Sequence, residues 1–183
     1  MAGLAPEVWF PVVTLLVGAL IGLITQSITD WRTGERERLA RLEQRLDAAR
    51  DRRIEFQRAT LLELQERVGE LIRAAGEANH SDEMVFKDTG KWRSTLLPEG
   101  VSHRFFLAQT STIRLRERVS DEPIRQLAKE LTNVCVEVGM ADSQSKGRHW
   151  MIQAADISGV LNMRIGEQLR TLDNIEDAAI AKK

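Results

Sequence analysis

The feature that most constrains this chain is a long stretch near its N-terminus without any charged side chain, from Val8 to Thr29. The whole chain of 183 residues carries 26 lysine or arginine and 27 aspartate or glutamate residues, and only one of these precedes the stretch. At ~1.5 Å of rise per helical residue, the segment Val8–Ile28 is long enough to cross a hydrocarbon layer of about 30 Å. It predicts one transmembrane helix within residues 1–30, followed by a charged domain.

A cleaved signal peptide is the main alternative for this stretch. The residues before it contain Glu7 and no lysine or arginine, and no A-x-A cleavage site follows it. Signal peptides begin with a basic region and end at small residues, so the pattern favours a true membrane span. A helix buried in a protein core is a second alternative, although charge-free helices of this length are uncommon in a domain this small.

The flanks of the stretch predict its orientation. Tryptophan is enriched at both membrane–water interfaces, and arginine is enriched on the cytoplasmic side. In this sequence arginine follows the stretch and never precedes it. The expected interface anchors are Trp9, Trp31, Arg32, Arg36 and Arg38. We therefore expect a single-pass protein of a bacterial inner membrane, with its N-terminus outside and its C-terminal domain in the cytoplasm.

One face of the predicted span carries small and polar residues. Gly18 and Gly22 form a GxxxG pair, a spacing that lets two helix backbones approach closely in lipid. The full face consists of Thr14, Gly18, Gly22, Thr25, Gln26 and Thr29. It predicts self-association of the helix. A stronger hypothesis is that the same face lines a pore in a ring of subunits.

The rest of the chain predicts an all-α fold, because apolar residues recur at helical spacing and no segment alternates as a strand would. We expect a charged juxtamembrane stalk helix over residues 31–58 and a cytoplasmic helical bundle over residues 59–183. One long helix is expected from Glu35 to about Ala75. Its first heptad seam consists of Leu39, Leu42, Leu46 and Ala49, and its second of Leu61, Leu64, Val68, Leu71 and Ala75. The second seam predicts a core face, whereas the first predicts a coiled-coil stalk that is either a spacer or a contact between subunits.

Three more helices are expected after a turn-rich region at residues 76–100. The first covers about residues 101–119, and the second begins at Asp121 before Pro123, which is a strong N-terminal signal. The last follows a polar loop at residues 141–148. The single cysteine, Cys135, lies in an apolar stripe and is predicted to be a buried core thiol.

Candidate catalytic residues are few. Arg73 and His80 have the spacing R-x6-H, although an arginine-rich chain produces such spacings by chance. His103 beside Arg104, and His149 beside Arg148, could contact anions or cap helices. No phosphate-binding loop, dinucleotide fingerprint, nucleophile elbow or metal-ligand spacing occurs, so we expect no cofactor, no metal and no enzymatic function.

In layout the chain resembles the small single-span membrane accessory proteins of type VI CRISPR antiviral systems. These combine one N-terminal span, a helical cytoplasmic domain and a degenerate HEPN-like R…H pattern, for which Arg73 and His80 are the matching residues here. The resemblance implies a ring-shaped membrane pore that strengthens antiviral defence, lined by the small and polar face of the span. It also implies the partners: membrane lipid, further copies of the chain, and a CRISPR effector or another defence protein.

Three hypotheses of function follow. The first is a homo-oligomeric, membrane-anchored effector that permeabilises the inner membrane when it is triggered through its cytoplasmic domain. The second is a membrane-tethered scaffold or adaptor whose helical domain docks a protein partner. The third is a HEPN-type ribonuclease. The balanced charge, a net −1, does not indicate direct binding of nucleic acid.

Overall fold

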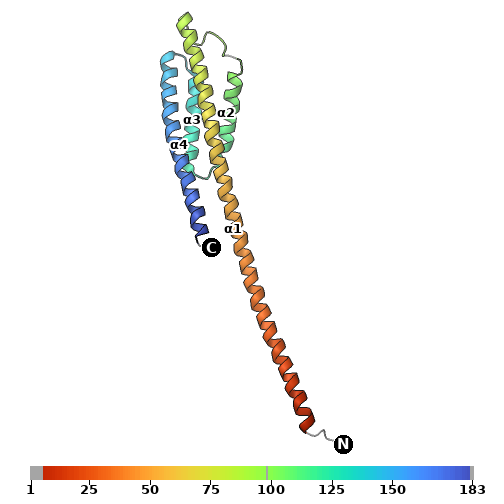
Figure 1. Ribbon diagram of the computed structural model, residues 1–183. Helices are drawn as coiled ribbons and strands as arrows, with labels where there is room; N and C mark the ends of the chain where they lie inside the picture. The colour runs from red at the N-terminus through yellow and green to blue at the C-terminus, as the bar shows by residue number, and fades with distance from the viewer. Residues whose placement is uncertain (1–5, 98, 182–183) are drawn as a thin grey trace. The chain divides into compact units, whose positions relative to one another are not determined.

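The computed structural model describes residues 6–97 and 99–181, and within residues 6–36 it describes the side chains of only Leu15, Gly18 and Glu35. The described residues form four α-helices and no strand (Figure 1). Their bounds are α1 Pro6–Thr89, α2 Val101–Arg116, α3 Glu122–Met140 and α4 Gln144–Ile180. The predictions of an all-helical chain and of a helical bundle are confirmed.

The predicted transmembrane helix is the principal correction. No helix in the described parts of the chain is both long enough and apolar enough to cross a membrane. The predicted span and the single-pass placement in an inner membrane are wrong on this finding. In the part of α1 whose side chains are described, from Glu35 onward, charged residues occur in nearly every turn up to Arg58, and each is costly in hydrocarbon. Apart from Leu15 and Gly18, the side chains of Val8–Ile28 lie outside the described residues.

The chain divides into two compact units, residues 1–50 and residues 51–183. In the first unit the described backbone is one uninterrupted helix, the beginning of α1. The helix continues without a break through residues 31–34. The seam leucines Leu39, Leu42 and Leu46 are 57%, 54% and 70% exposed. The first heptad seam therefore lies on the surface of its unit.

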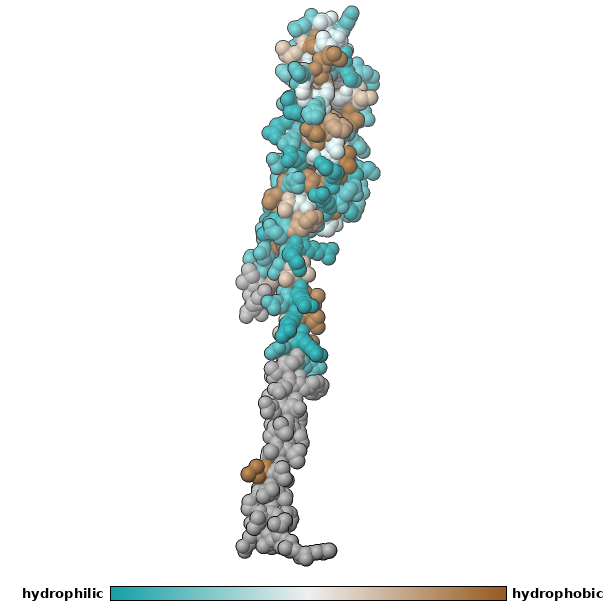
Figure 2. All heavy atoms as spheres, turned by 90° about the vertical axis from the view of Figure 1, so that its right-hand side faces the viewer, coloured by the Kyte–Doolittle hydropathy of each residue, from teal (hydrophilic) through white to brown (hydrophobic). Residues whose placement is uncertain are grey.

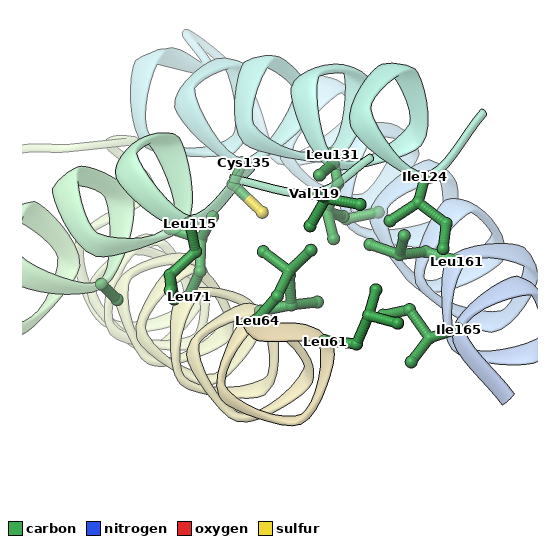
Figure 3. Close-up of a cluster of buried hydrophobic side chains, with 14 of the residues drawn as sticks. Leu61, Leu64, Leu71, Leu115, Val119, Ile124, Leu131, Cys135, Leu161 and Ile165 are labelled. Atoms are coloured by element: carbon green, nitrogen blue, oxygen red, sulfur yellow. The ribbon is translucent and has the colours of Figure 1, made fainter. Parts of the chain in front are cut away.

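The second unit is a bundle in which the rest of α1 packs with α2, α3 and α4. The second heptad seam of α1 supplies one wall of its core, as predicted: Leu61, Leu64 and Leu71 are no more than 1% exposed. Figure 3 shows these side chains pointing toward residues from the other three helices. The facing residues include Leu115, Ile124, Leu131, Cys135, Leu161 and Ile165. Burial of such side chains contributes about 1.5–3 kcal/mol each, so this core holds the four segments together.

The observed α1 is longer than predicted, because it continues past Ala75 to Thr89. The buried stripe extends through Ala78 and Asp82 at the same three- and four-residue spacing. Packing along this buried stripe keeps the chain helical up to Thr89, although turn-forming residues after Ala75 had predicted a turn-rich region.

Two helix starts agree with the sequence signals. Asp121 caps α3, where its Oδ1 accepts a hydrogen bond from the backbone N–H of Ile124 at 3.0 Å, and Pro123 lies in the first turn. Gly100 precedes α2 with φ of 81°, a left-handed conformation that favours glycine. These local features fix where the connections between the helices end.

The end of the bundle near the α3–α4 loop is closed by the segment after α1. Trp92 donates a hydrogen bond from Nε1 to the backbone oxygen of Ala141 at 2.9 Å, and its ring packs edge-on against Phe86. Gly147 in α4 lies against the Trp92 ring, and an added Cβ there would overlap Oδ1 of Asn79. A larger residue at this position would require the Asn79 and Trp92 side chains to shift.

Candidate functional site

The residues predicted to line a pore fall mostly outside the described side chains. This applies to Thr14, Gly22, Thr25, Gln26 and Thr29, and also to the expected anchors Trp9, Trp31, Arg32 and Arg36. Gly18 is described and exposed, and an added Cβ there would meet no atom within 4 Å. Arg38 is also exposed. The pore-forming and antiviral role stays an untested prediction.

Arg73 and His80, the weak catalytic candidates, both lie exposed on α1. Seven residues of helix separate them by about 10 Å of rise. Arg73 lines a hollow of the bundle, whereas His80 is not part of its lining. The structure therefore places the two residues in different surroundings on the same helix.

This hollow, the α1–α2 groove, encloses about 670 Å³ between α1 and α2. Its lining residues recur at three- and four-residue spacing, which puts them on one face of each helix. From α1 they are Arg67, Glu70, Arg73, Ala74 and Glu77, and from α2 they are Arg104, Leu107, Ala108 and Ser111. Ala74 and Ala108 are the buried members of this lining, each 3% exposed, and their small side chains leave the space between the helices unfilled.

The groove is polar along its rim and carries an excess of one positive charge. Three guanidinium groups meet two carboxylates there. Arg67 pairs with Glu70 at 2.7 Å, and this hydrogen bond raises the pKa of the Arg67 guanidinium. Arg104 of α2 pairs with Glu77 of α1. Among the described residues Arg73 forms no ion pair, so its guanidinium can receive a carboxylate from outside.

One exposed apolar side chain of α2 lines the groove: Leu107, which is 50% exposed. Phe106 and Ile113 are also exposed, but helical periodicity places them on a different face of α2 from the groove-lining residues. Figure 2 views the side on which α2 lies, and it shows hydrophobic side chains scattered among hydrophilic ones over the bundle. A cationic groove that includes an exposed aliphatic side chain is suited to an amphipathic ligand.

Sequence reasoning found part of this site. It selected Arg73 for a catalytic reason and Arg104 as a possible anion contact, but it did not bring them to one groove. Leu107 was not predicted, because it lies outside the buried stripe of α2. The available signal was that it is large and apolar yet falls off the stripe formed by residues 101, 105, 108, 112 and 115.

Cys135 offers no chemistry at this site. Its thiol is fully buried in the core, and desolvation raises its pKa to about 12. Reactive cysteines have lowered pKa values and contact with solvent. The prediction of a buried core thiol is confirmed.

Comparison with known proteins adds no family to this description: no family model, no curated protein and no solved structure matches the chain.

Proposed function

We propose that the chain is a non-enzymatic adaptor that docks a protein partner in the α1–α2 groove. The partner segment is amphipathic: a carboxylate pairs with Arg73, and an adjacent apolar residue covers Leu107. The observation that carries this proposal is the unpaired Arg73 guanidinium beside the exposed side chain of Leu107 in a preformed groove.

The charge of the groove supports an acidic partner. The carboxylates of Glu70 and Glu77 are already engaged by Arg67 and Arg104, which leaves Arg73 with its hydrogen-bonding capacity unused. An arginine that binds a carboxylate in two places gives both affinity and a fixed orientation. A neutral or basic segment would leave this guanidinium without a counter-ion.

The apolar surface supports a protein segment rather than a small anion. A phosphate or a small carboxylic acid would leave the exposed side chain of Leu107 uncovered. An amphipathic helix laid along the groove contacts both Leu107 and Arg73.

The test starts from the full-length chain used as bait in its native cells, with four variants compared to the unchanged protein. Arg73→Glu and Leu107→Ser alter the groove. The matched controls on α4 are Arg170→Glu and Met163→Ser, both at exposed positions. A protein that is retained by the controls and lost by both groove variants is the expected partner.

Titration of that purified partner gives the decisive measurement. Arg73→Glu is expected to weaken its binding about tenfold or more, because attraction to a carboxylate becomes repulsion. His80→Ala is expected to leave the affinity unchanged, since His80 does not line the groove. If no protein depends on the groove, or if Arg73→Glu binds as tightly as the unchanged chain, the adaptor proposal is wrong.

A further inference from the structure

The first heptad seam of α1 is an apolar helix face without an intramolecular partner. Leu39, Leu42 and Leu46 are each more than half exposed, and Ala49 is exposed as well. The unit to which they belong, residues 1–50, contains no second described element that could cover them. Apolar side chains at heptad spacing normally form the contact between two helices.

The charges of this helix do not explain its stability without a partner. A solvated helix with polar residues on all sides depends on many ion pairs between residues four apart. Between described side chains of residues 35–50, one such pair is present, Glu37 with Arg41 at 3.0 Å. Glu43 is followed at this spacing by Asp47, and Arg41 by Arg45, which place like charges together. Burial of the seam leucines on association would therefore stabilise this helix more than the ion pairs within the helix do.

We propose that two copies of the chain associate through this seam in parallel and in register. The leucine seam, as we call Leu39, Leu42, Leu46 and Ala49, then forms successive layers in which each residue meets its own counterpart. Leu39 and Leu46 occupy one core position of the heptad, and Leu42 and Ala49 the other.

The charges that flank the seam decide the orientation. In a parallel pair, each flanking residue faces the residue five positions later in the second copy. Arg38 then faces Glu43 of the second copy, which is favourable, and Arg45 faces Arg50, which is not. An antiparallel pair with the same layers places Arg45 against Arg45 and Glu43 against Glu43, so like charges meet on both flanks. The parallel arrangement is the one with a complementary pair.

The seam is short, which makes the expected association reversible. Two leucine-rich heptads bury little area compared with a standard interface, and they must offset the entropy lost on association. This self-association is independent of the adaptor function, since the seam lies in residues 1–50 and the α1–α2 groove in residues 51–183.

The first experiment measures the mass of the full-length chain by sedimentation over a range of protein concentrations. A mild detergent keeps the apolar stretch Val8–Ile28 from causing non-specific association. The unchanged chain is expected to form at least a dimer as concentration rises. Leu42→Glu combined with Leu46→Glu is expected to weaken association by about 100-fold or more, since both central layers are lost. The same double change at Ile152 and Met163 of α4 is the control, and it should leave association intact.

Charge changes test the orientation without touching the layers. Glu43→Arg removes the favourable contact with Arg38 and is expected to weaken association roughly three- to tenfold. Arg50→Glu converts the repulsion with Arg45 into attraction and is expected to strengthen association by a similar factor. In the antiparallel arrangement Glu43→Arg merely exchanges one like pair for another.

A disulfide test fixes the register. Ala49→Cys should cross-link readily to its own counterpart under mild oxidation, because the two residues share one layer. Ala40→Cys, one position after a seam residue and on the outer surface, should not. Native Cys135 does not interfere, because it is buried. A monomer at every concentration, equal association of the Leu42→Glu/Leu46→Glu variant, or equal cross-linking at Ala40 and Ala49 would each overturn the proposal.

Discussion

Helix α1 carries two heptad seams of nearly the same composition, but the first is exposed and the second is buried. Leu42 in the first seam is 54% exposed, whereas Leu64 in the second is fully buried. Both leucines lie in a continuous helix at regular apolar spacing. Heptad spacing therefore identifies a helix face that is able to pack against a partner. Whether that face is buried depends on whether other helices of the chain supply apolar residues to cover it.

The neighbouring residues explain part of the difference. The second seam is met by α2, α3 and α4, each of which contributes an apolar stripe of its own to the common core. The first seam precedes these helices and has no such stripe within its unit. Charged residues flank the first seam on both sides, and they remain hydrated while the seam is unpaired.

The largest difference between the two seams should appear on truncation of their leucines. Leu64→Ala is expected to lower the free energy of unfolding by about 2–5 kcal/mol, because it leaves a cavity in a packed core. Leu42→Ala is expected to change it by about 0.5 kcal/mol or less, since no cavity forms at an exposed position. Urea unfolding of the full chain, at a dilution where it is monomeric, measures both. Equal costs would mean that Leu42 is covered within one chain.

A smaller difference is expected between two arginines of α1. Arg58 lies in the bundle and bridges to α4, with Nη2 at 2.5 Å from Oδ1 of Asp173 and 2.8 Å from Oε2 of Glu176. These hydrogen bonds raise the pKa of its guanidinium. Arg41 pairs with Glu37, within the same exposed helix.

Arg58→Met should therefore lower the unfolding free energy more than Arg41→Met does, because two carboxylates of another helix lose their counter-ion. The loss at Arg58 should shrink as salt is added. Thermal unfolding at low and high ionic strength distinguishes the two variants. If both have the same melting temperature as the unchanged chain, the bridge contributes nothing to docking of α4 on α1.

The smallest effect concerns two aspartates, Asp82 in the bundle and Asp47 in the first unit. Burial raises the pKa of Asp82 above its ordinary value of 3.8, and nearby Arg93 partly opposes this. The folded chain then binds a proton more tightly than the unfolded chain does. Stability falls as pH rises from about 3.8 through the raised pKa, and it is level above it.

Asp82→Asn should consequently stabilise the chain slightly at neutral pH, and the gain should disappear at a pH below 3.8. Asp47→Asn, at an exposed position of the first unit, is the matched control variant. Urea midpoints measured across this pH range provide the comparison. A loss of stability on Asp82→Asn at neutral pH would show instead that its carboxylate makes a favourable interaction in the folded chain.

The sequence predicted the helices well where local signals and burial agree. Asp121 before Pro123 predicted the start of α3, and the apolar stripe around Cys135 predicted a buried core thiol. It failed where they conflict. Turn-forming residues after Ala75 favour a loop, but the buried stripe through Ala78 and Asp82 extends α1 to Thr89.

The candidate site was predictable only in fragments. Arg73 stood out for its R-x6-H spacing with His80, and Arg104 stood out as the neighbour of His103, yet nothing local connects α1 to α2. Their common groove depends on the small side chains of Ala74 and Ala108, which leave room between two packed helices. Leu107 becomes a functional candidate only once α2 is seen to bury its other face.

What this sequence determined by itself is the helical class, the position of the apolar stripes and the starts of α2 and α3, because each follows from spacing and capping within a few residues. The tertiary structure alone decided which heptad seam enters a core, how far α1 extends and where a groove opens. Those outcomes depend on surfaces contributed by residues far apart in the chain, and periodicity along one helix carries no information about them.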